Sequence, residues 1–442
     1  MIKYKFMGQV SNEQVLEYYN KNRIDCFVHA SELEGAPVSI MEAESAGIPI
    51  ISTDVGGVKE MIDGNGFLLP INFTPVEMAD KIVELLELPK EEREKLGKKS
   101  RQIWEEKLDA EKNAKEFVSF LGKEGGKKLK NIILITNGYP YLGSEIGFLQ
   151  AELKELLKSF DVTIIACITT EIDDSKKRIF EANALKLLNS ESLKGKVTFC
   201  EYTYKYSFLA LIPCALSYFF DKRVKLERKE IVHSKNKMSI KLWESIKYYG
   251  EALAFYNWYS ETFKTEFDKE DTIIYSFWNL PPVLGLCLNR NKIGISKILT
   301  RVHGYDYQDE QWGKRMRKPF APVIDTLIDK MVFVCNTGKE YYCKRHSIDD
   351  SKCIVSFLGS GSYTPVENAT RENEDIVASQ SDDCHRIVSC ASLIPLKRVN
   401  LIIEALGIVA EKHKGKDLEW IHFGDGVLRE EIEQQATKVL GN

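Results

Sequence analysis

Two glutamates, Glu34 and Glu42, stand eight residues apart in a segment with several glycines and prolines. A carboxylate accepts hydrogen bonds from hydroxyl groups and stabilises positive charge close to it. Glu34 lies in a predicted loop, and Glu42 follows about one and a half turns into a predicted helix. A helix start presents free N–H groups and the positive end of the helix dipole to an anion. We therefore expect both carboxylates to lie beside one anion-binding site.

The elements that position these glutamates form a β–α–β unit. Alternating apolar residues predict a buried strand over residues 25–30. Pro37 suits the first position of a helix, because an N–H would be unpaired there. The predicted helix covers residues 38–46 and ends at Gly47, and residues 48–52 are expected to form the next strand.

Retaining glycosyltransferases carry a Glu-x7-Glu motif, which this segment resembles in the form Glu34-Gly35-Ala36-Pro37-Val38-Ser39-Ile40-Met41-Glu42. The flanking residues also match, at Ser31, Ala43, Gly47-Ile48-Pro49 and Val55-Gly56-Gly57. The whole pattern resembles glycosyltransferase family 4. The alternative interpretation is an ordinary β–α–β unit whose two glutamates are solvated.

This resemblance implies the GT-B fold, an α/β architecture of two Rossmann-like domains facing across a cleft. It implies transfer of a sugar from a nucleotide diphosphate sugar, UDP- or GDP-linked, to the hydroxyl group of a glycan or lipid-linked acceptor. Retention would come from departure and attack on the same face, with the leaving phosphate taking the acceptor's proton. Residues 303–306 and 394–398 resemble bacterial enzymes that build capsule or exopolysaccharide repeats. No metal is expected, because GT-B enzymes generally need none for the transfer.

Three side chains are expected at the reacting groups. Lys397 matches the family's lysine beside the diphosphate, where positive charge stabilises the leaving group. Glu34 matches the glutamate near the donor sugar, and His303, after a predicted strand, matches a histidine that faces this sugar. Ser392 stands where the family usually has a second cation, an arginine, and the neighbouring Arg398 is a candidate for that contact.

Other residues are expected to hold the donor. Glu42 matches the glutamate that accepts hydrogen bonds from the ribose hydroxyls. The amides of Ala36, Val38 and Ser39 are expected to stabilise the diphosphate, each by about 0.3–1 kcal/mol. The remaining predicted contacts lie in loop and turn backbone, at Gly35, Pro37, Gly8, Gln9, Gly143, Gly424 and Gly426.

The composition indicates the cellular compartment that suits the protein and argues against nucleic acid as a partner. The chain has 442 residues and a net charge of −4, so it offers no global basic field for nucleic acid. Its ten cysteines include no C-x-x-C pair and no zinc-binding spacing, which favours a reducing cytoplasm. The first residues lack the apolar core of a signal peptide.

The longest apolar run covers residues 208–220. As a helix it would be roughly 20 Å long, too short to cross a bilayer. With Lys222, Arg223 and Lys225 beside it, the run could lie on the inner face of a membrane. A helix packed inside the domain is the alternative interpretation.

The order of the parts along the chain is unusual. Residues 366–442 and 1–121 resemble the first and second halves of one nucleotide-binding domain, with the last helix of the second half crossing to the other domain. Residues 129–365 resemble the acceptor domain, and residues 122–128 are interpreted as a flexible linker. Joining the last residue to a predicted strand near residues 2–8 restores the family's usual order. We therefore interpret the chain as a circular permutant, with two fused partial enzymes as the alternative.

Strand-like runs alternate with helical patterns along the whole chain, which predicts parallel α/β sheets. The predicted strands not yet mentioned cover residues 4–10, 67–69, 129–135, 162–168, 197–202, 272–277, 297–303, 331–334, 387–391 and 418–423. Three other functions fit the same features: a sugar-nucleotide epimerase, a phosphorylase, and a non-catalytic scaffold that binds a sugar nucleotide or a polysaccharide.

Overall fold

The computed structural model divides the chain into two compact units. Unit 1 combines Met1–Ala110 with Leu358–Asn442, and unit 2 is the intervening Glu111–Phe357. The structure describes all residues except 1, 127–128, 143–144, 189–192, 194, 205–207, 234–237, 265–270, 296, 308–317, 347, 362–383, 414–416 and 442.

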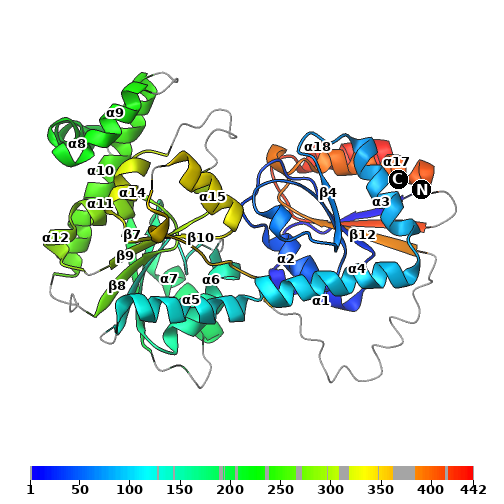
Figure 1. Cartoon of the computed structure of the whole chain (residues 1–442), viewed down its shortest axis with the longest axis horizontal. Helices are drawn as coiled ribbons and strands as arrows, with labels where there is room; N and C mark the ends of the chain where they lie inside the picture. Colours follow the sequence, from blue (N-terminus) through cyan, green and yellow to red (C-terminus); the bar gives the residue numbers. More distant parts are fainter. Residues whose placement is uncertain are drawn as a thin grey trace. The chain divides into compact units, whose positions relative to one another are not determined.

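Unit 1 is built on a six-stranded sheet with the order β1-β13-β12-β2-β3-β4. Its strands are β1 (Ile2–Phe6), β2 (Cys26–His29), β3 (Ile50–Thr53), β4 (Gly66–Leu69), β12 (Cys384–Cys390) and β13 (Asp417–Phe423). Every pair of neighbours is parallel, and Ile2 pairs with Leu418 across β1 and β13. The blue N-terminal and the orange C-terminal segments therefore share one sheet (Figure 1).

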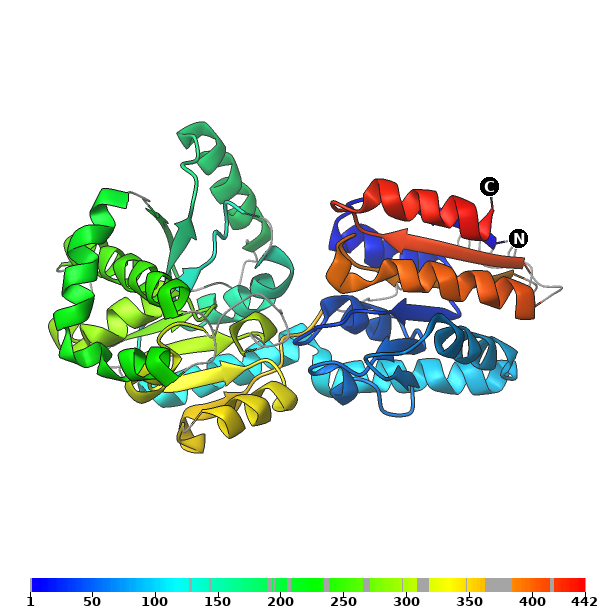
Figure 2. The ribbon, with the colours of Figure 1, turned by 90° about the horizontal axis from the view of Figure 1, so that it is seen from above.

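Helices cover this sheet and form its core. They are α1 (Asn12–Lys21), α2 (Val38–Ser45), η1 (Val58–Glu60), α3 (Pro75–Glu87), α4 (Lys90–Ile103), η7 (Pro395–Lys397), α17 (Val399–Lys412) and α18 (Arg429–Leu440). A π-helical turn, η2 (Trp104–Leu108), follows α4. Buried side chains such as Leu85 of α3, Ile403 of α17 and Trp420 of β13 join in one apolar cluster. Figure 2 shows α17 and α18 running beside β13.

Unit 2 contains a seven-stranded sheet with the order β11-β10-β9-β8-β5-β6-β7. The strands are β5 (Asn131–Thr136), β6 (Asp161–Ile168), β7 (Val197–Thr203), β8 (Thr272–Ser276), β9 (Lys297–Val302), β10 (Lys330–Phe333) and β11 (Cys353–Val355). All pairs are parallel. Strand β5 reads NIILIT and is buried after its first residue, as expected for a parallel sheet with both faces covered.

The helices of unit 2 form a separate core, in which Tyr249 of α10 and Phe320 stack against each other. They are α5 (Ala110–Gly125, starting at the end of unit 1), α6 (Ile146–Leu157), α7 (Asp174–Leu188), α8 (Phe208–Phe220), η4 (Lys222–Val224), α9 (Lys225–His233), α10 (Met238–Thr262), α11 (Pro281–Leu288), α12 (Arg290–Ile293), α13 (Gly304–Tyr307), α14 (Ala321–Leu327), α15 (Asn336–Arg345) and η5 (Asp350–Lys352).

The predicted α/β class is confirmed, with two parallel sheets surrounded by helices. A cleft between two domains and the circular permutation remain predictions.

Several predicted boundaries differ from the structure by a few residues, and two of these differences have a clear cause. Strand β1 ends at Phe6 and does not reach residue 10, because Gly8 takes a φ of +71° and forms an isolated antiparallel bridge with Gly424. The predicted flexible linker begins inside helix α5, which continues to Gly125. Glu124 holds this last turn through a carboxylate oxygen 2.5 Å from Lys297 Nζ.

One predicted site residue, the loop glycine Gly143, lies outside the described part of the chain. In the part that the structure describes, no helix is long and apolar enough to cross a membrane.

Candidate functional site

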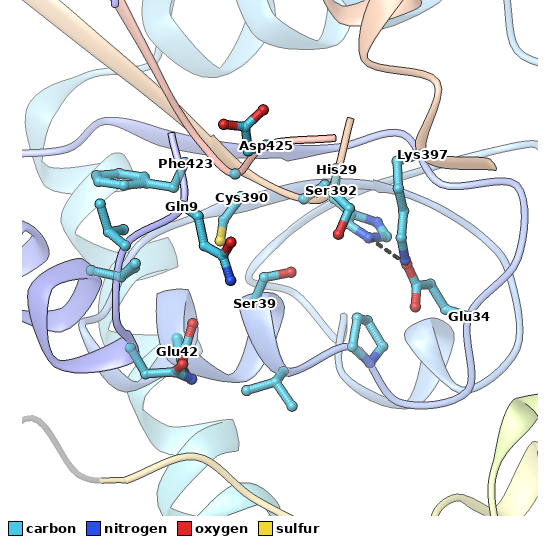
Figure 3. A pocket seen from close by; sticks show the side chains of 17 residues that line it. Gln9, His29, Glu34, Ser39, Glu42, Cys390, Ser392, Lys397, Phe423 and Asp425 are labelled. Atoms are coloured by element: carbon cyan, nitrogen blue, oxygen red, sulfur yellow. Dashed lines mark hydrogen bonds and ion pairs between the residues drawn. The ribbon is translucent and has the colours of Figure 1, made fainter. Parts of the chain in front are cut away.

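A pocket of about 430 Å³ opens at the carboxyl ends of three neighbouring strands of unit 1, β13, β12 and β2. Ligands of parallel α/β sheets bind at this edge, where the chain direction reverses between strand and helix. The pocket is lined by Gln9, Val10, Asn12, Val15, His29, Glu34, Pro37, Val38, Ser39, Glu42, Cys390, Ala391, Ser392, Lys397, Phe423, Gly424 and Asp425. Figure 3 shows Glu34 and Lys397 at one end of it and Glu42 at the other.

An ion pair occupies the first end of the pocket. Lys397 Nζ, on the short helix η7, lies 2.5 Å from Glu34 Oε1 in the loop after β2. His29 Nε2 lies 3.1 Å from the same oxygen. Burial alone would raise the pKa of Glu34, but the hydrogen bond and charge of His29, together with Lys397, lower it to about 2. Glu34 is therefore ionised at neutral pH, and Lys397 has a charged partner when no ligand is bound.

His29 is held in place by two serines. Its Nδ1 lies 2.9 Å from Ser52 Oγ on β3, and its Nε2 lies 2.9 Å from Ser31 Oγ. His29 was not among the site residues predicted from the sequence. The signal was present, because this histidine is the last residue of strand β2, at the edge where ligands are expected.

Glu42 occupies the second end of the pocket in a different environment. Asn12 Nδ2 donates to Glu42 Oε1 over 2.6 Å. Burial raises the pKa of Glu42 to about 7, and the Asn12 hydrogen bond opposes this only in part. Near neutral pH, Glu42 can therefore lose its proton when hydroxyl donors bind beside it. The ionised carboxylate then accepts hydrogen bonds from a vicinal diol. Asn12 is a second residue that the sequence analysis missed.

The start of α2 forms the floor between these two ends. Pro37 was predicted to suit the first helical position, but it is the N-cap of this helix, which begins at Val38 as predicted. Among the described residues, no side chain caps the helix. The first N–H groups of any helix have no intrahelical acceptor. Val38 and Ser39, the first two residues of α2, line the pocket, so the positive end of the helix dipole faces it. Gly35 and Ala36 belong to the same loop but are not among the lining residues.

Close backbone contacts form one side of the pocket, next to the ends of β13 and β1. Gly424 N donates to Gly8 O over 2.9 Å, which joins the ends of β13 and β1. Gly424 has a φ of +131°, and a Cβ there would stand 2.0 Å from Ala391 O. A Cβ on Gly426 would stand 2.5 Å from Leu393 O. Gly424 and Gly426 are therefore needed for backbone packing. Gly424 lines the pocket, and so does Gln9, which follows Gly8 in the sequence.

Arg398 does not reach this pocket. It donates from Nε to Ala30 O over 2.7 Å, from Nη1 to Ile71 O over 2.6 Å and from Nη2 to Ser31 O over 3.1 Å. Its side chain thus fixes the loop after β2, and it is not among the lining residues. The sequence suggested Arg398 as a substitute for the missing arginine, and this geometry does not support that role. Ser392 does line the pocket and offers a hydroxyl group there.

His303 belongs to unit 2, directly after strand β9. Its ring stacks on Trp278 with 4.0 Å between centroids, and neither ring nitrogen has a hydrogen-bond partner among the described residues. Burial lowers the pKa of His303 well below its usual value, and the nearby positive charges of Arg301 and Lys318 add to this. The imidazole is therefore neutral at physiological pH.

Part of unit 1 is similar to a known protein family. Residues 2–103 match the family described as Glycosyl transferases group 1. The chain is 44% identical over 64 residues to the O-antigen biosynthesis glycosyltransferase WbnH of Escherichia coli, covering 14% of this chain and 18% of that one. It is 30% identical over 92 residues to the putative colanic acid biosynthesis glycosyltransferase WcaL of Escherichia coli (strain K12), covering 20% and 22%. The matched segments thus span less than a quarter of these relatives.

Solved structures are more distantly similar. The N-terminal domain of Candida albicans trehalose-6-phosphate phosphatase aligns with a TM-score of 0.42 and 14% identity, over 72% of this chain and 71% of that one. An alpha,alpha-trehalose-phosphate synthase (UDP-forming) from Burkholderia vietnamiensis aligns with a TM-score of 0.39 and 11% identity, over 71% of each chain. Both scores are too low to support an argument about the fold or the function.

Proposed function

We propose that this protein is a glycosyltransferase that moves a sugar from a nucleotide diphosphate sugar to a hydroxyl acceptor, with retention of configuration. One observation carries this proposal. A single pocket combines a lysine, the uncapped start of α2 and, at its far end, a carboxylate suited to a vicinal diol. A nucleoside diphosphate has the same sequence of groups, with a ribose diol beside a doubly charged diphosphate. The match of residues 2–103 to Glycosyl transferases group 1 supports the same assignment.

In this proposal, catalysis consists mainly of stabilising the departing diphosphate. Negative charge develops on the leaving oxygen, and Lys397 and the first amides of α2 stabilise it. As Lys397 turns toward the phosphates, its contact with the carboxylate of Glu34 is partly lost. Glu34 remains beside His29, the largest of the causes that lower its pKa, and its carboxylate supports the positive charge that develops on the sugar. The acceptor attacks the face from which the diphosphate departs, and the leaving phosphate takes the proton.

The acceptor is proposed to be a glycan or a lipid-linked hydroxyl in polysaccharide synthesis. The relatives named above are described as glycosyltransferases of O-antigen and colanic acid biosynthesis. The donor base, uracil or guanine, is proposed to lie near Gln9 and Val10, which line the pocket.

His303 is proposed to contact the donor sugar, because it lies at a strand end and its neutral imidazole has no hydrogen-bond partner for either ring nitrogen among the described residues. His303→Ala should then lower the rate of sugar transfer by a factor of 10² or more and leave the dissociation constant for the free nucleoside diphosphate unchanged. Steady-state transfer assays and calorimetric titration measure the two quantities. A parallel loss of nucleotide affinity would show that His303 acts on folding or on the nucleotide instead.

The first test is a thermal-shift panel of UDP, GDP, ADP and their sugar conjugates. A ligand at 100 times its dissociation constant adds about 2.7 kcal/mol to the free energy of unfolding. One nucleotide should stabilise the wild type and Glu44→Gln, whose carboxylate lies on α2 but does not line the pocket. The same nucleotide should give a much smaller shift with Glu42→Ala. If no nucleotide stabilises the wild type, the assignment of this pocket is wrong.

A further inference from the structure

Helix α8 (Phe208–Phe220) exposes a row of large apolar side chains in unit 2. Ile212 is 54% exposed, Leu216 60%, Phe219 50% and Phe220 82%. These residues are spaced by four, three and one positions, so they lie on one face of the helix. Soluble proteins seldom leave such a continuous apolar face in water, because its burial is worth about 25 cal/mol for each Å².

The orientation of this face is fixed by the opposite side of α8. Tyr218 is fully buried and contacts the rings of Tyr249 and Phe320. Ser217 Oγ lies 3.2 Å from Tyr249 Oη, and Arg228 donates to Tyr218 O over 2.6 Å. Helix α8 thus packs on α10 and is tied to α9, as Figure 1 shows within unit 2. The apolar row cannot turn inward without breaking these contacts.

Positive charge lies directly beside the apolar face. Lys222 and Lys225 follow the C-terminal end of α8, and both are exposed. Arg223 is also exposed, but it donates to both carboxylate oxygens of Asp221 and to Leu288 O, so it braces the turn. The chain as a whole carries a net charge of −4, so this local positive charge is not a general property of its surface.

We propose that α8 and the turn after it dock on an anionic lipid surface. The apolar row of Ile212, Leu216, Phe219 and Phe220 would enter the boundary between headgroups and acyl chains, with α8 parallel to the membrane plane. Lys222 and Lys225 would contact anionic headgroups. A neutral partner would bury the apolar row but would leave these lysines without a counterpart. This docking surface is independent of the nucleotide pocket in unit 1.

Vesicle flotation of the full chain tests the proposal. The protein should float with vesicles of phosphatidylcholine mixed with phosphatidylglycerol, more weakly at high salt, and hardly at all with phosphatidylcholine alone. Replacing Phe219 and Phe220 by serine should lower the partition coefficient roughly tenfold or more. Lys222→Glu should lower it roughly fivefold, and Lys225→Glu should add a similar factor.

The controls are exposed apolar residues elsewhere on the chain. Ile179→Ser on α7 and Val427→Ser before α18 remove side chains that are as exposed as those of α8, and they should leave the partition coefficient unchanged. Far-ultraviolet circular dichroism checks that each variant is folded. The proposal is wrong if the wild type binds neither vesicle, if it binds both equally, or if the control variants lose as much binding. It is also wrong if the two phenylalanines instead control a concentration-dependent dimer in light scattering.

Discussion

Glu34 and Glu42 have the same side chain and similar burial, yet their pKa values shift in opposite directions. Glu34 has a histidine and a lysine beside it, and they lower its pKa to about 2. Glu42 has one neutral amide donor, which is too little to offset burial, and its pKa rises to about 7. The first carboxylate is thus suited to remain charged near developing positive charge. The second can gain or lose a proton at physiological pH.

The raised pKa of Glu42 predicts a specific pH dependence of stability. Between pH 4.5, its usual pKa, and about 7, the folded state holds a proton that the unfolded state has lost. The free energy of unfolding therefore falls as pH rises through this window, by up to about 3 kcal/mol. Glu42→Gln should remove this part of the decline. Urea titrations of both proteins at pH 5 and pH 8 measure the difference, and identical pH slopes would contradict the prediction.

Lys397 and Arg398 are adjacent cations with different surroundings, which gives a matched pair of variants. Lys397→Met should weaken binding of a nucleoside diphosphate about tenfold or more, and binding of the nucleoside much less, because only the diphosphate carries charge beside this residue. Arg398→Met should lower stability, since three backbone carbonyls lose their donors, without this selectivity. Isothermal titration with both ligands distinguishes them. Equal losses for nucleoside and diphosphate would argue against a phosphate contact at Lys397.

At the scale of elements, the pocket depends on how closely loops approach the sheet edge. The loop after β13 passes over the end of β12, and this contact leaves no space for a side chain at Gly424. The start of α2 reaches the same edge from β2, and η7 reaches it from β12. The loops after three neighbouring parallel strands therefore converge on one pocket, because the carboxyl ends of parallel strands lie at the same edge of the sheet.

A comparison of Gly64 with Gly424 distinguishes the stability cost of backbone strain from the cost of a lack of space for a side chain. Gly64 and Gly424 both have positive φ, +76° and +131°, but a Cβ on Gly64 would meet nothing within 4 Å. Gly64→Ala should cost about 1 kcal/mol for its conformation alone. Gly424→Ala should cost clearly more, because the loop must also move away from Ala391 O, and it should weaken nucleotide binding. Thermal unfolding and titration of both variants test this, and equal costs would rule out the close approach as the cause.

At the scale of the whole molecule, both ends of the chain are needed for unit 1. Strand β1 pairs with β13, and β2 pairs with β12, so the N-terminal segment contributes four of the six strands and the C-terminal segment two. The Tyr4 and Thr437 side chains, from β1 and α18, meet 3.1 Å apart. This shared sheet supports the proposed permuted order of the two halves, which remains a prediction.

The shared sheet predicts how separated segments behave. Residues 111–357 have their own sheet and core and should fold alone. Residues 1–110 alone should remain largely unfolded, because β12 and β13 lie between β1 and β2 in the sheet. Mixing residues 1–110 with residues 358–442 should restore circular dichroism and slow amide exchange in both. A folded segment 1–110 without its complement would contradict the sheet order as the basis of its stability.

The residues of the site were partly predictable. The Glu34–Glu42 string and Lys397 stood out because their types and local spacing suit phosphate and sugar chemistry. Asn12, His29 and Phe423 did not stand out, although all three line the pocket. Each follows or ends a strand or begins a helix, and such positions are too common in α/β proteins to be selected without knowing which strands are neighbours.

The sequence by itself determined the α/β class and most element positions, because apolar periodicity and glycine or proline boundaries are local properties. It also determined the β–α–β unit that carries both glutamates. Only the tertiary structure decided that β1 lies beside β13, that Lys397 pairs with Glu34 and that Arg398 turns to backbone carbonyls. Those results depend on contacts between residues hundreds of positions apart. Burial and the neighbouring polar and charged side chains in the folded chain also set the two pKa values, and local spacing does not encode burial.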